Sequence, residues 1–386
     1  MRILQVLPAL NSGGVERGTI DLSQALVAQG HDSFCVSQGG QLVSTLEASG
    51  GKHIQLPVHS KNPVTIWRNI GKLTALIKQQ EIDLVHVRSR APAWSVHHAS
   101  RRSGIPMIST FHGQYGSHSK LKRWYNSGML KADTTIAVSD FIMHHIAETY
   151  PKQHGRLTRI YRGVNTDYFS INKVNDETRQ ALSLSWGLPP NAQNIIMLPG
   201  RLARLKGHEK FIEALSMLAS EHYHAVVVGE TAGREEYIRE LQSQAQALGI
   251  RTSGPQQQLY FAGGCTDMPT AYSLSDIVVS ASTKPEAFGR TTCEAQSMGK
   301  LVVATAHGGS CETLHPSQQA GMCQPSDSKS LAAALERQLG TSRETRTEIS
   351  IASRQHVIQH FSLTNMCNET VDLYQQVLTR HAATEH

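Results

Sequence analysis

The 386-residue sequence lacks several features that would each point to a particular class of protein. It contains no run of about 18 or more apolar residues, so it predicts no membrane-spanning helix. Met1 leads directly into a strand-like pattern without a small-residue cleavage site, so we expect no signal peptide. The six cysteines are scattered and form no CxxC pair. This argues against a disulfide framework or a thiolate zinc site and favours a reducing cytoplasm.

The GxGxxG fingerprint of dinucleotide-binding folds is also absent, which argues against an NAD-dependent oxidoreductase. Charge, by contrast, is present and unevenly distributed. Residues 1–169 contain 19 Lys and Arg against 10 Asp and Glu, whereas residues 170–386 contain 18 against 21. The first half is therefore basic and suits an anionic partner, although a basic surface also serves solubility. We expect no nucleic-acid partner and no cofactor.

The length predicts two domains, and short apolar runs alternate with helical patterns in both halves of the chain. This alternation predicts two doubly wound, Rossmann-like α/β domains whose ligands bind where the strands end. We expect an N-terminal domain over residues 1–171, a linker over 172–190 and a C-terminal domain over 191–365. Residues 366–386 are expected to form a helix that packs back toward the N-terminal domain, with a frayed end past Arg380.

The most informative segment runs from Lys284 to Ala295 and contains two glutamates, Glu286 and Glu294, separated by seven residues. The first follows a predicted strand, and the second lies in the first or second turn of the next predicted helix. Backbone N–H groups at such a helix start form an anion site. Carboxylates on either side of it are placed to accept hydrogen bonds from sugar and ribose hydroxyls. The alternative is a capped helix with two surface glutamates.

Two further loops suit phosphate binding. Arg201 and Lys206 lie five residues apart, after one predicted strand and before a helix, which suits a diphosphate. Gly13 and Gly14 follow the first strand and open a helix, where glycines let a phosphate approach the backbone. Each loop alone is weak evidence for phosphate binding, because exposed Arg/Lys pairs and Gly-Gly turns are common in proteins.

Taken together, these segments resemble the retaining glycosyltransferases of family 4, which have the GT-B fold of two Rossmann-like domains facing a central cleft. The Glu286–Glu294 segment resembles the E-x7-E motif of that family. The resemblance implies that Glu286 contacts the donor sugar and that the backbone of Phe288-Gly289-Arg290 meets the phosphates. It also implies that Glu294 holds the ribose and that Arg201 and Lys206 bind the pyrophosphate. Many relatives have an aliphatic residue where this chain has Arg290, so the resemblance assigns this side chain no role.

In the first half, the resemblance implies that Gly13 and Gly14 face the donor phosphates and that His112 lies near the transferred sugar and the acceptor. Arg88 and Arg90 lie at a predicted strand end where an acceptor is expected. No DxD sequence, the usual metal-binding signature of the other common glycosyltransferase fold, is present, so we expect a metal-independent reaction.

The resemblance is to the branch that builds the lipopolysaccharide core. It implies transfer of a hexose, with mannose from GDP-mannose as the first candidate and UDP-hexoses as the second. The acceptor is then a lipid-linked or anionic saccharide. A nucleotide-sugar epimerase of the same fold and a non-catalytic sugar-nucleotide-binding protein remain alternatives.

The segment Lys120–Lys131 has the pattern of a basic amphipathic helix, with Leu121, Trp124, Tyr125 and Met129 near one face. Such a helix binds an anionic membrane interface peripherally, here at the inner face of the cytoplasmic membrane. Alternatively, the apolar residues pack into the first domain and the cations are simply solvated.

Overall fold

The computed structural model describes residues 1–11, 13–116, 119–151, 156–220 and 222–384. They form two compact units, each built on one parallel sheet. The first unit comprises Met1–Gly163 together with the segment from Leu363 onward, and the second comprises Val164–Ser362.

The first unit contains a seven-stranded parallel sheet in the order β3-β2-β1-β4-β5-β6-β7. The order reverses between β1 and β4, so the chain winds to one side of β1 and then to the other. Two short strands, β3 and β7, escape sequence prediction because their end residues are exposed and their middle residues are only partly buried, so neither strand forms an apolar run. The strands are β1 (Arg2–Val6), β2 (Asp32–Ser37), β3 (Lys52–Gln55), β4 (Leu84–Val87), β5 (Met107–Phe111), β6 (Thr134–Ala137) and β7 (Arg156–Arg159).

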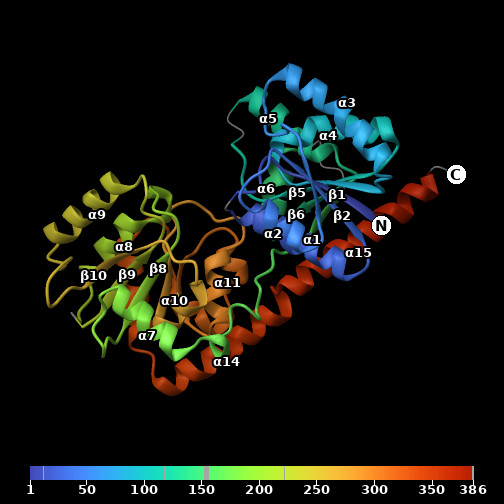
Figure 1. The fold of residues 1–386 in the computed structure, drawn as a ribbon. Helices are drawn as coiled ribbons and strands as arrows, with labels where there is room; N and C mark the ends of the chain where they lie inside the picture. The colour runs from blue at the N-terminus through green and yellow to red at the C-terminus, as the bar shows by residue number, and fades with distance from the viewer. Residues whose placement is uncertain (12, 117–118, 152–155, 221, 385–386) are drawn as a thin grey trace. The chain divides into compact units, whose positions relative to one another are not determined.

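Helices cover both faces of this sheet (Figure 1). On one face, α1 and the C-terminal helix α15 share a core with the strands, in which Leu26 and Tyr374 are fully buried. On the other, α3 packs along α4. The helices are α1 (Gly14–Ala28), α2 (Val43–Ala48), α3 (Pro63–Gln79), α4 (Arg90–Ser103), α5 (Lys120–Ser127), α6 (Asp140–Thr149) and α15 (Leu363–Thr384), with a 3-10 turn η1 (Gly128–Lys131).

The second unit repeats the plan with a six-stranded parallel sheet in the order β10-β9-β8-β11-β12-β13. Its largest apolar cluster joins the strands to α8, α9 and α13. The strands are β8 (Ile195–Pro199), β9 (His224–Val228), β10 (Leu259–Gly263), β11 (Ile277–Ser280), β12 (Leu301–Thr305) and β13 (Met322–Cys323). The helices are α7 (Asp176–Ser185), α8 (His208–Leu215), α9 (Glu235–Ala247), α10 (Met268–Leu274), α11 (Arg290–Ser297), α12 (Ser310–Thr313), α13 (Ser328–Leu339) and α14 (Arg343–His360), with 3-10 turns η2 (Ile171–Lys173), η3 (Arg204–Lys206) and η4 (Pro316–Gly321).

The division of the chain differs from the sequence-based expectation of a linker over 172–190. The units divide after Gly163 and after Ser362, and the supposed linker contains helix α7. Asn175 caps this helix by accepting a hydrogen bond from the backbone of Glu177, and the buried Trp186 and Leu188 follow it. These features make residues 172–190 part of the second unit. Helix α15 runs to Thr384, so the described residues past Arg380 are helical rather than frayed.

The segment 120–131 also departs from the single helix that its pattern predicts. Helix α5 ends at Ser127 and continues as the 3-10 turn η1. Met129 is fully buried, whereas Leu121 and Trp124 are 73% and 56% exposed. The change of helix type therefore divides the expected apolar face between the core and the surface.

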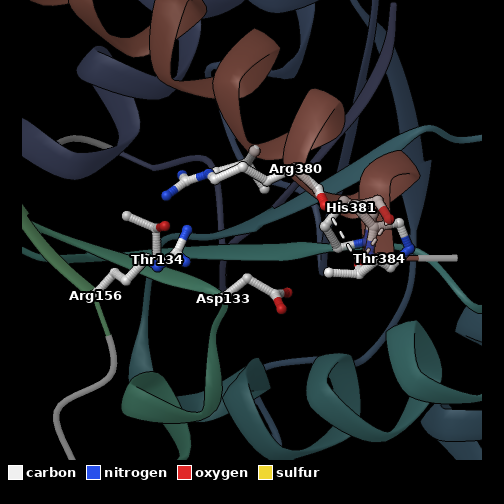
Figure 2. A pocket seen from close by; sticks show the side chains of 8 residues that line it. Asp133, Thr134, Arg156, Arg380, His381 and Thr384 are labelled. Atoms are coloured by element: carbon white, nitrogen blue, oxygen red, sulfur yellow. Dashed lines mark hydrogen bonds between the residues drawn. The ribbon is translucent and has the colours of Figure 1, made fainter. Parts of the chain in front are cut away.

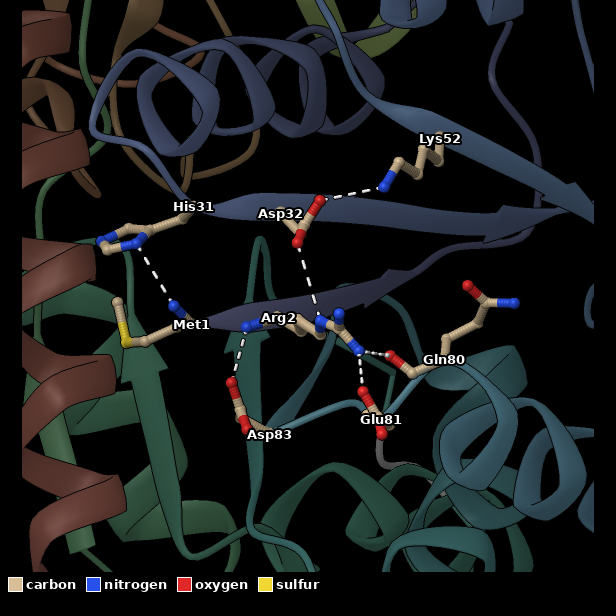
Figure 3. Close-up of polar contacts among 8 residues, drawn as sticks. All are labelled: Met1, Arg2, His31, Asp32, Lys52, Gln80, Glu81 and Asp83. Carbon is tan, nitrogen blue, oxygen red and sulfur yellow. Dashed lines mark hydrogen bonds and ion pairs between the residues drawn. The ribbon is translucent and has the colours of Figure 1, made fainter.

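Charged side chains connect the strands of the first unit at their amino-terminal ends (Figure 3). The Arg2 backbone N–H donates to Asp83 at 2.6 Å, and Asp32 accepts from Lys52 at 2.9 Å. The Arg2 guanidinium also pairs with Glu81. These groups are exposed, so we expect each pair to contribute about 0–1 kcal/mol.

A pocket of about 290 Å³ also lies at the amino-terminal ends of the strands, where the last turns of α15 meet the starts of β6 and β7 (Figure 2). Arg156, Arg380 and His381 line it together with Asp133. It contains none of the predicted site residues, because those follow the opposite, carboxyl ends of the strands. In the described part of the chain, no helix is long and apolar enough to cross a membrane.

Candidate active site

In the second unit, the predicted donor residues lie where the strand order reverses, between β8 and β11. Lys206 follows β8 and Glu286 follows β11. Lys206 Nζ donates to Glu286 Oε1 at 2.6 Å, and Ser282 Oγ donates to the same oxygen at 2.5 Å. The loop that follows β8 is joined to the loop that follows β11 by a hydrogen bond from the Thr283 N–H to the Leu205 carbonyl at 2.9 Å. The reversal of strand order thus brings an anion and a cation 80 residues apart into one site.

The Glu286–Lys206 pair is largely shielded, with 16% and 24% of the two side chains exposed. Burial by itself would raise the pKa of Glu286, but the charge and hydrogen bond of Lys206 outweigh it and lower the pKa below its ordinary value. Glu286 is therefore a carboxylate at neutral pH. Its second oxygen, Oε2, accepts no hydrogen bond within the described residues, which leaves an acceptor for a ligand hydroxyl.

Two glycines permit this close approach of loops. Gly207 has φ of 73°, and a Cβ there would lie 2.0 Å from the Ala281 carbonyl oxygen. Gly308 has φ of 66°, and its Cβ would lie 2.4 Å from the Glu286 carbonyl oxygen. Any other residue at either position would push the glutamate loop away from its neighbours.

The second predicted glutamate, Glu294, lies in the second turn of α11 and is 9% exposed. Its Oε1 accepts from Arg290 Nε at 2.6 Å, and its Oε2 accepts from the Tyr272 hydroxyl at 2.8 Å. Tyr272 is fully buried, and burial followed by the Glu294 charge raises its pKa well above the usual value. Both donors therefore hold Glu294 as an oriented carboxylate.

The start of α11 lies between the two glutamates. Gly289 is its N-cap, with φ of 90° and no side-chain cap, and Phe288 before it is buried against Phe361. Arg201 is exposed and forms no hydrogen bond or ion pair with any described residue. The neighbouring Gly200 lies close to Lys206, since a Cβ added to this glycine would be 3.7 Å from Lys206 Cε. Unlike Lys206, Arg201 is thus not joined to the glutamates by a polar contact.

In the first unit, the predicted residues follow β1, β4 and β5, of which β1 and β4 flank the reversal of order. Gly13 is the N-cap of α1, which follows β1, and no side chain caps this helix. The Glu16 carboxylate turns back toward the loop, because a Cβ on Gly13 would lie 2.3 Å from Glu16 Oε2. Arg162 donates a hydrogen bond to the Gly14 carbonyl. The Gly-Gly loop is therefore bordered by a carboxylate and a guanidinium.

Arg88 follows β4 directly and His112 follows β5, and the two arginines 88 and 90 enter different surroundings. Arg88 is 5% exposed and donates to Gln5 Oε1 at 3.2 Å. Arg90 stacks on the Tyr115 ring at 4.3 Å and donates to Asn126. Burial, and then the charges of Arg88 and Arg162, lower the pKa of His112 well below its usual value. The His112 imidazole is therefore neutral at physiological pH.

Comparison with known proteins assigns this arrangement to a family. Residues 12–168 match the sequence model of Glycosyltransferase Family 4, and residues 186–356 match that of Glycosyl transferases group 1. A glycosyltransferase from Rickettsia africae is 36% identical, with 98% of each chain covered and a TM-score of 0.89. The chain belongs to the glycosyltransferases of family 4 type.

Two other relatives of this glycosyltransferase are more distant. Anabaena HepE, crystallised with UDP and glucose, is 20% identical over 97% of this chain and 100% of its own, with a TM-score of 0.81. Mannosylfructose-phosphate synthase from Agrobacterium fabrum is 26% identical over 211 residues, which are 53% of this chain and 44% of the synthase. The likeness to HepE, like the two parallel sheets themselves, shows the GT-B fold.

Sequence reasoning missed four side chains that the glycosyltransferase places beside the predicted ones. Ser282 and Tyr272 hold the two glutamates, and His307 Nε2 lies 2.8 Å from the Ser282 carbonyl oxygen. Arg162 holds the Gly-Gly loop. Ser282 lies two residues before the informative segment that begins at Lys284. Tyr272 carried no local signal, because it comes from a helix that follows a different strand.

Proposed function

We propose that this glycosyltransferase moves a hexose, with retention of anomeric configuration and without a metal ion, from a nucleotide-sugar to an anionic or lipid-linked saccharide. The single observation that carries the proposal is the pairing of Lys206 with Glu286 beside the uncapped start of α11. It combines a cation and helix N–H groups for a diphosphate with an oriented carboxylate for sugar hydroxyls.

In this proposal, Lys206 and Arg201 bind the diphosphate, and the Phe288-Gly289-Arg290 backbone contacts its oxygens. Glu286 Oε2 accepts a hydrogen bond from a hydroxyl of the donor sugar, and Glu294 accepts hydrogen bonds from the ribose hydroxyls. The Gly13-Gly14 loop lets the donor phosphates approach its backbone. His112, Arg88 and Arg90 serve the acceptor, and His112, as a neutral imidazole, orients the reacting hydroxyl.

The proposed reaction occurs on one face of the sugar. The bond between the anomeric carbon and the diphosphate oxygen breaks, and a bond from that carbon to the acceptor oxygen forms on the same face. The acceptor proton passes to the departing phosphate oxygen. Lys206 and Arg201 stabilise the charge that develops on the diphosphate, which is the largest contribution we assign to the protein.

For the donor we propose GDP-mannose first and a UDP-hexose second. HepE was crystallised with UDP and glucose, which favours a UDP-hexose, and the name of the Agrobacterium synthase contains a mannosyl group and a phosphate, which favours mannose and an anionic acceptor. The basic first half of the chain supports an anionic acceptor such as a lipopolysaccharide-core saccharide.

A thermal-shift screen of nucleotide-sugars tests the donor assignment, because a bound ligand stabilises the folded protein. Arg201→Ala and Lys206→Ala should then weaken binding of the stabilising nucleoside diphosphate in calorimetry. Arg204→Ala is the matched control, since Arg204 is 69% exposed and pairs with Glu209 and Glu240. Equal affinity in all four proteins would remove Arg201 and Lys206 from the phosphate site.

Incubation with donor alone separates the alternatives. An epimerase converts the nucleotide-sugar without an acceptor, and a non-catalytic binding protein leaves it unchanged even with acceptor present. Product that appears only when an acceptor saccharide is added supports transfer. Inversion at the anomeric carbon, read by NMR, would contradict the proposed retention.

We also propose that the protein works in the cytoplasm, peripherally bound to the inner face of the membrane. Lys120, Lys122 and Arg123 are exposed on α5 beside the exposed Leu121 and Trp124. Cations next to an aromatic anchor bind an anionic interface, and each is worth about 1 kcal/mol near such a surface. This surface suits an enzyme whose acceptor is lipid-linked.

A further inference from the structure

Arg88 is a buried cation without a matching anion. Its side chain is 5% exposed, its Nε has no hydrogen-bond partner, and no carboxylate of the described residues lies within ion-pair distance. Four nearby groups would stabilise the Arg88 charge if they were ionised: Tyr374, Cys367, Asp21 and Cys35. Burial raises the pKa of both thiols to about 12 and raises the pKa of Tyr374 as well, so none of these three groups offers a negative charge at neutral pH.

Arg162 brings a second cation to the same place. A Cβ on Gly18 of α1 would lie 3.4 Å from Arg88 Nη2 and 3.6 Å from Arg162 Nη2. A Cβ on Gly14, one turn earlier, would lie 3.0 Å from Arg162 Nη1. The two glycines on one side of α1 thus make room for both guanidinium groups.

His112 completes the surroundings. Its two ring nitrogens are both buried and lack hydrogen-bond partners, and the charges of Arg88 and Arg162 reach it. Both ring nitrogens of the neighbouring His86, in contrast, have hydrogen-bond partners. Nδ1 lies 2.6 Å from the Tyr374 hydroxyl, and Nε2 lies 2.7 Å from Thr110 Oγ1. Unsatisfied donors and acceptors therefore gather around Arg88 and His112, at the carboxyl ends of β4 and β5.

Burying the Arg88 charge beside a second cation and an unsatisfied imidazole costs free energy unless an opposite charge joins them. We infer that Arg88 and Arg162 form a subsite for a phosphate or carboxylate group on the acceptor, next to His112. The inference rests on the proposed function and narrows it, because the acceptor then carries its negative charge close to the hydroxyl that receives the sugar. Guanidinium groups suit either anion, since both present paired oxygens to planar N–H donors.

The test uses the full chain with its nucleotide site filled by saturating UDP or GDP, whichever raises Tm more. Calorimetric titrations with glucose 6-phosphate, glucuronate and glucose then probe the remaining site. We expect glucose 6-phosphate or glucuronate to bind at least about tenfold more tightly than glucose, as a lost charged hydrogen bond implies. Equal binding of glucose, or no binding of either anionic sugar, overturns the inference.

Arg162→Gln should remove this preference and weaken the anionic sugar at least about tenfold. Gly14→Ala should do the same without removing a charge, because its methyl group would displace the Arg162 guanidinium. Arg102→Gln, an exposed arginine in the last turn of α4, is the charge-matched control. Arg88→Gln is a weaker test, since a buried arginine also supports folding.

The negative group belongs either to the acceptor or to the donor diphosphate, and a titration with the nucleoside diphosphate alone separates them. The affinity of Arg162→Gln for the nucleoside diphosphate should stay within about twofold of the wild-type affinity. An equal loss of affinity for the nucleotide and for the anionic sugar overturns the acceptor assignment. Failure of the wild-type protein to bind any nucleotide would contradict the proposed function instead.

Discussion

The buried Tyr272 hydroxyl donates a 2.8 Å hydrogen bond to Glu294 Oε2, across the space between α10 and α11. The Tyr272 ring packs edge-to-face against the Phe169 ring, with the two ring centroids 5.8 Å apart. The phenol therefore determines how the Glu294 carboxylate is oriented, while Arg290 occupies the other oxygen.

We predict from this contact that Tyr272→Phe raises the donor KM about fivefold, the equivalent of a hydrogen bond worth about 1 kcal/mol. The turnover number should change less than about twofold, because Glu294 is assigned to the nucleotide rather than to the reacting atoms. Steady-state kinetics checks this, with Tyr260→Phe as control, since the Tyr260 hydroxyl donates to the Gln257 carbonyl. A fall in kcat without a change in KM would contradict the role.

Glu286→Ala should lower turnover by at least about 100-fold, the scale seen when a contact to the transition state is lost. The fold should survive, because Glu286 belongs to the site and not to the apolar core. Transfer assays and circular dichroism provide the measurement, with the exposed Glu240→Ala as control. Transfer at the wild-type rate in a folded Glu286→Ala protein would remove Glu286 from the site.

Lys206→Met should move the acid limb of the rate profile to higher pH. In the wild type, Lys206 lowers the pKa of Glu286, so the carboxylate and its stabilising pair persist above the ordinary pKa and are lost as pH falls through the lowered one. Without Lys206, only the Ser282 hydrogen bond and the His307 charge oppose the effect of burial, so the pKa of Glu286 rises. Profiles of kcat/KM against pH test the shift, and identical acid limbs in both proteins would show that Glu286 ionisation does not control the rate.

Activity should persist in excess EDTA, because cationic side chains and helix N–H groups are assigned to the diphosphate. A transfer assay with and without chelator measures this. Complete loss that Mg²⁺ or Mn²⁺ restores would establish an essential divalent ion.

Binding to vesicles should require anionic lipid, decrease with salt and weaken when Lys120, Lys122 and Arg123 are replaced by Ser. Sedimentation over a salt series measures all three effects. Replacing Lys52, Lys72 and Lys78 by Ser, exposed cations elsewhere in the first unit, provides the charge-matched control. Equal binding to neutral vesicles, or equal losses in both triple variants, would rule out α5 as the electrostatic anchor.

The sequence by itself determined the alternation of strands and helices, because buried parallel strands require apolar runs such as Ile277–Ser280. It also predicted the loops that follow β8 and β11, since glycines and charged residues at strand ends need little context. It failed at the edge strands β3 and β7, where no residue is fully buried and no apolar run forms. It failed too at residues 172–190, where polar composition concealed a capped helix.

Only the tertiary structure decided which side chains meet. Lys206 and Glu286 are joined by the reversal of strand order, and Tyr272 reaches Glu294 from another helix, so no local pattern encodes either pair. Arg88 and Arg90 are two residues apart in sequence, yet one is buried beside Arg162 and the other stacks on Tyr115. Sequence spacing specifies a strand end, but burial and neighbours from distant segments determine the charge and the partners of the residue placed there.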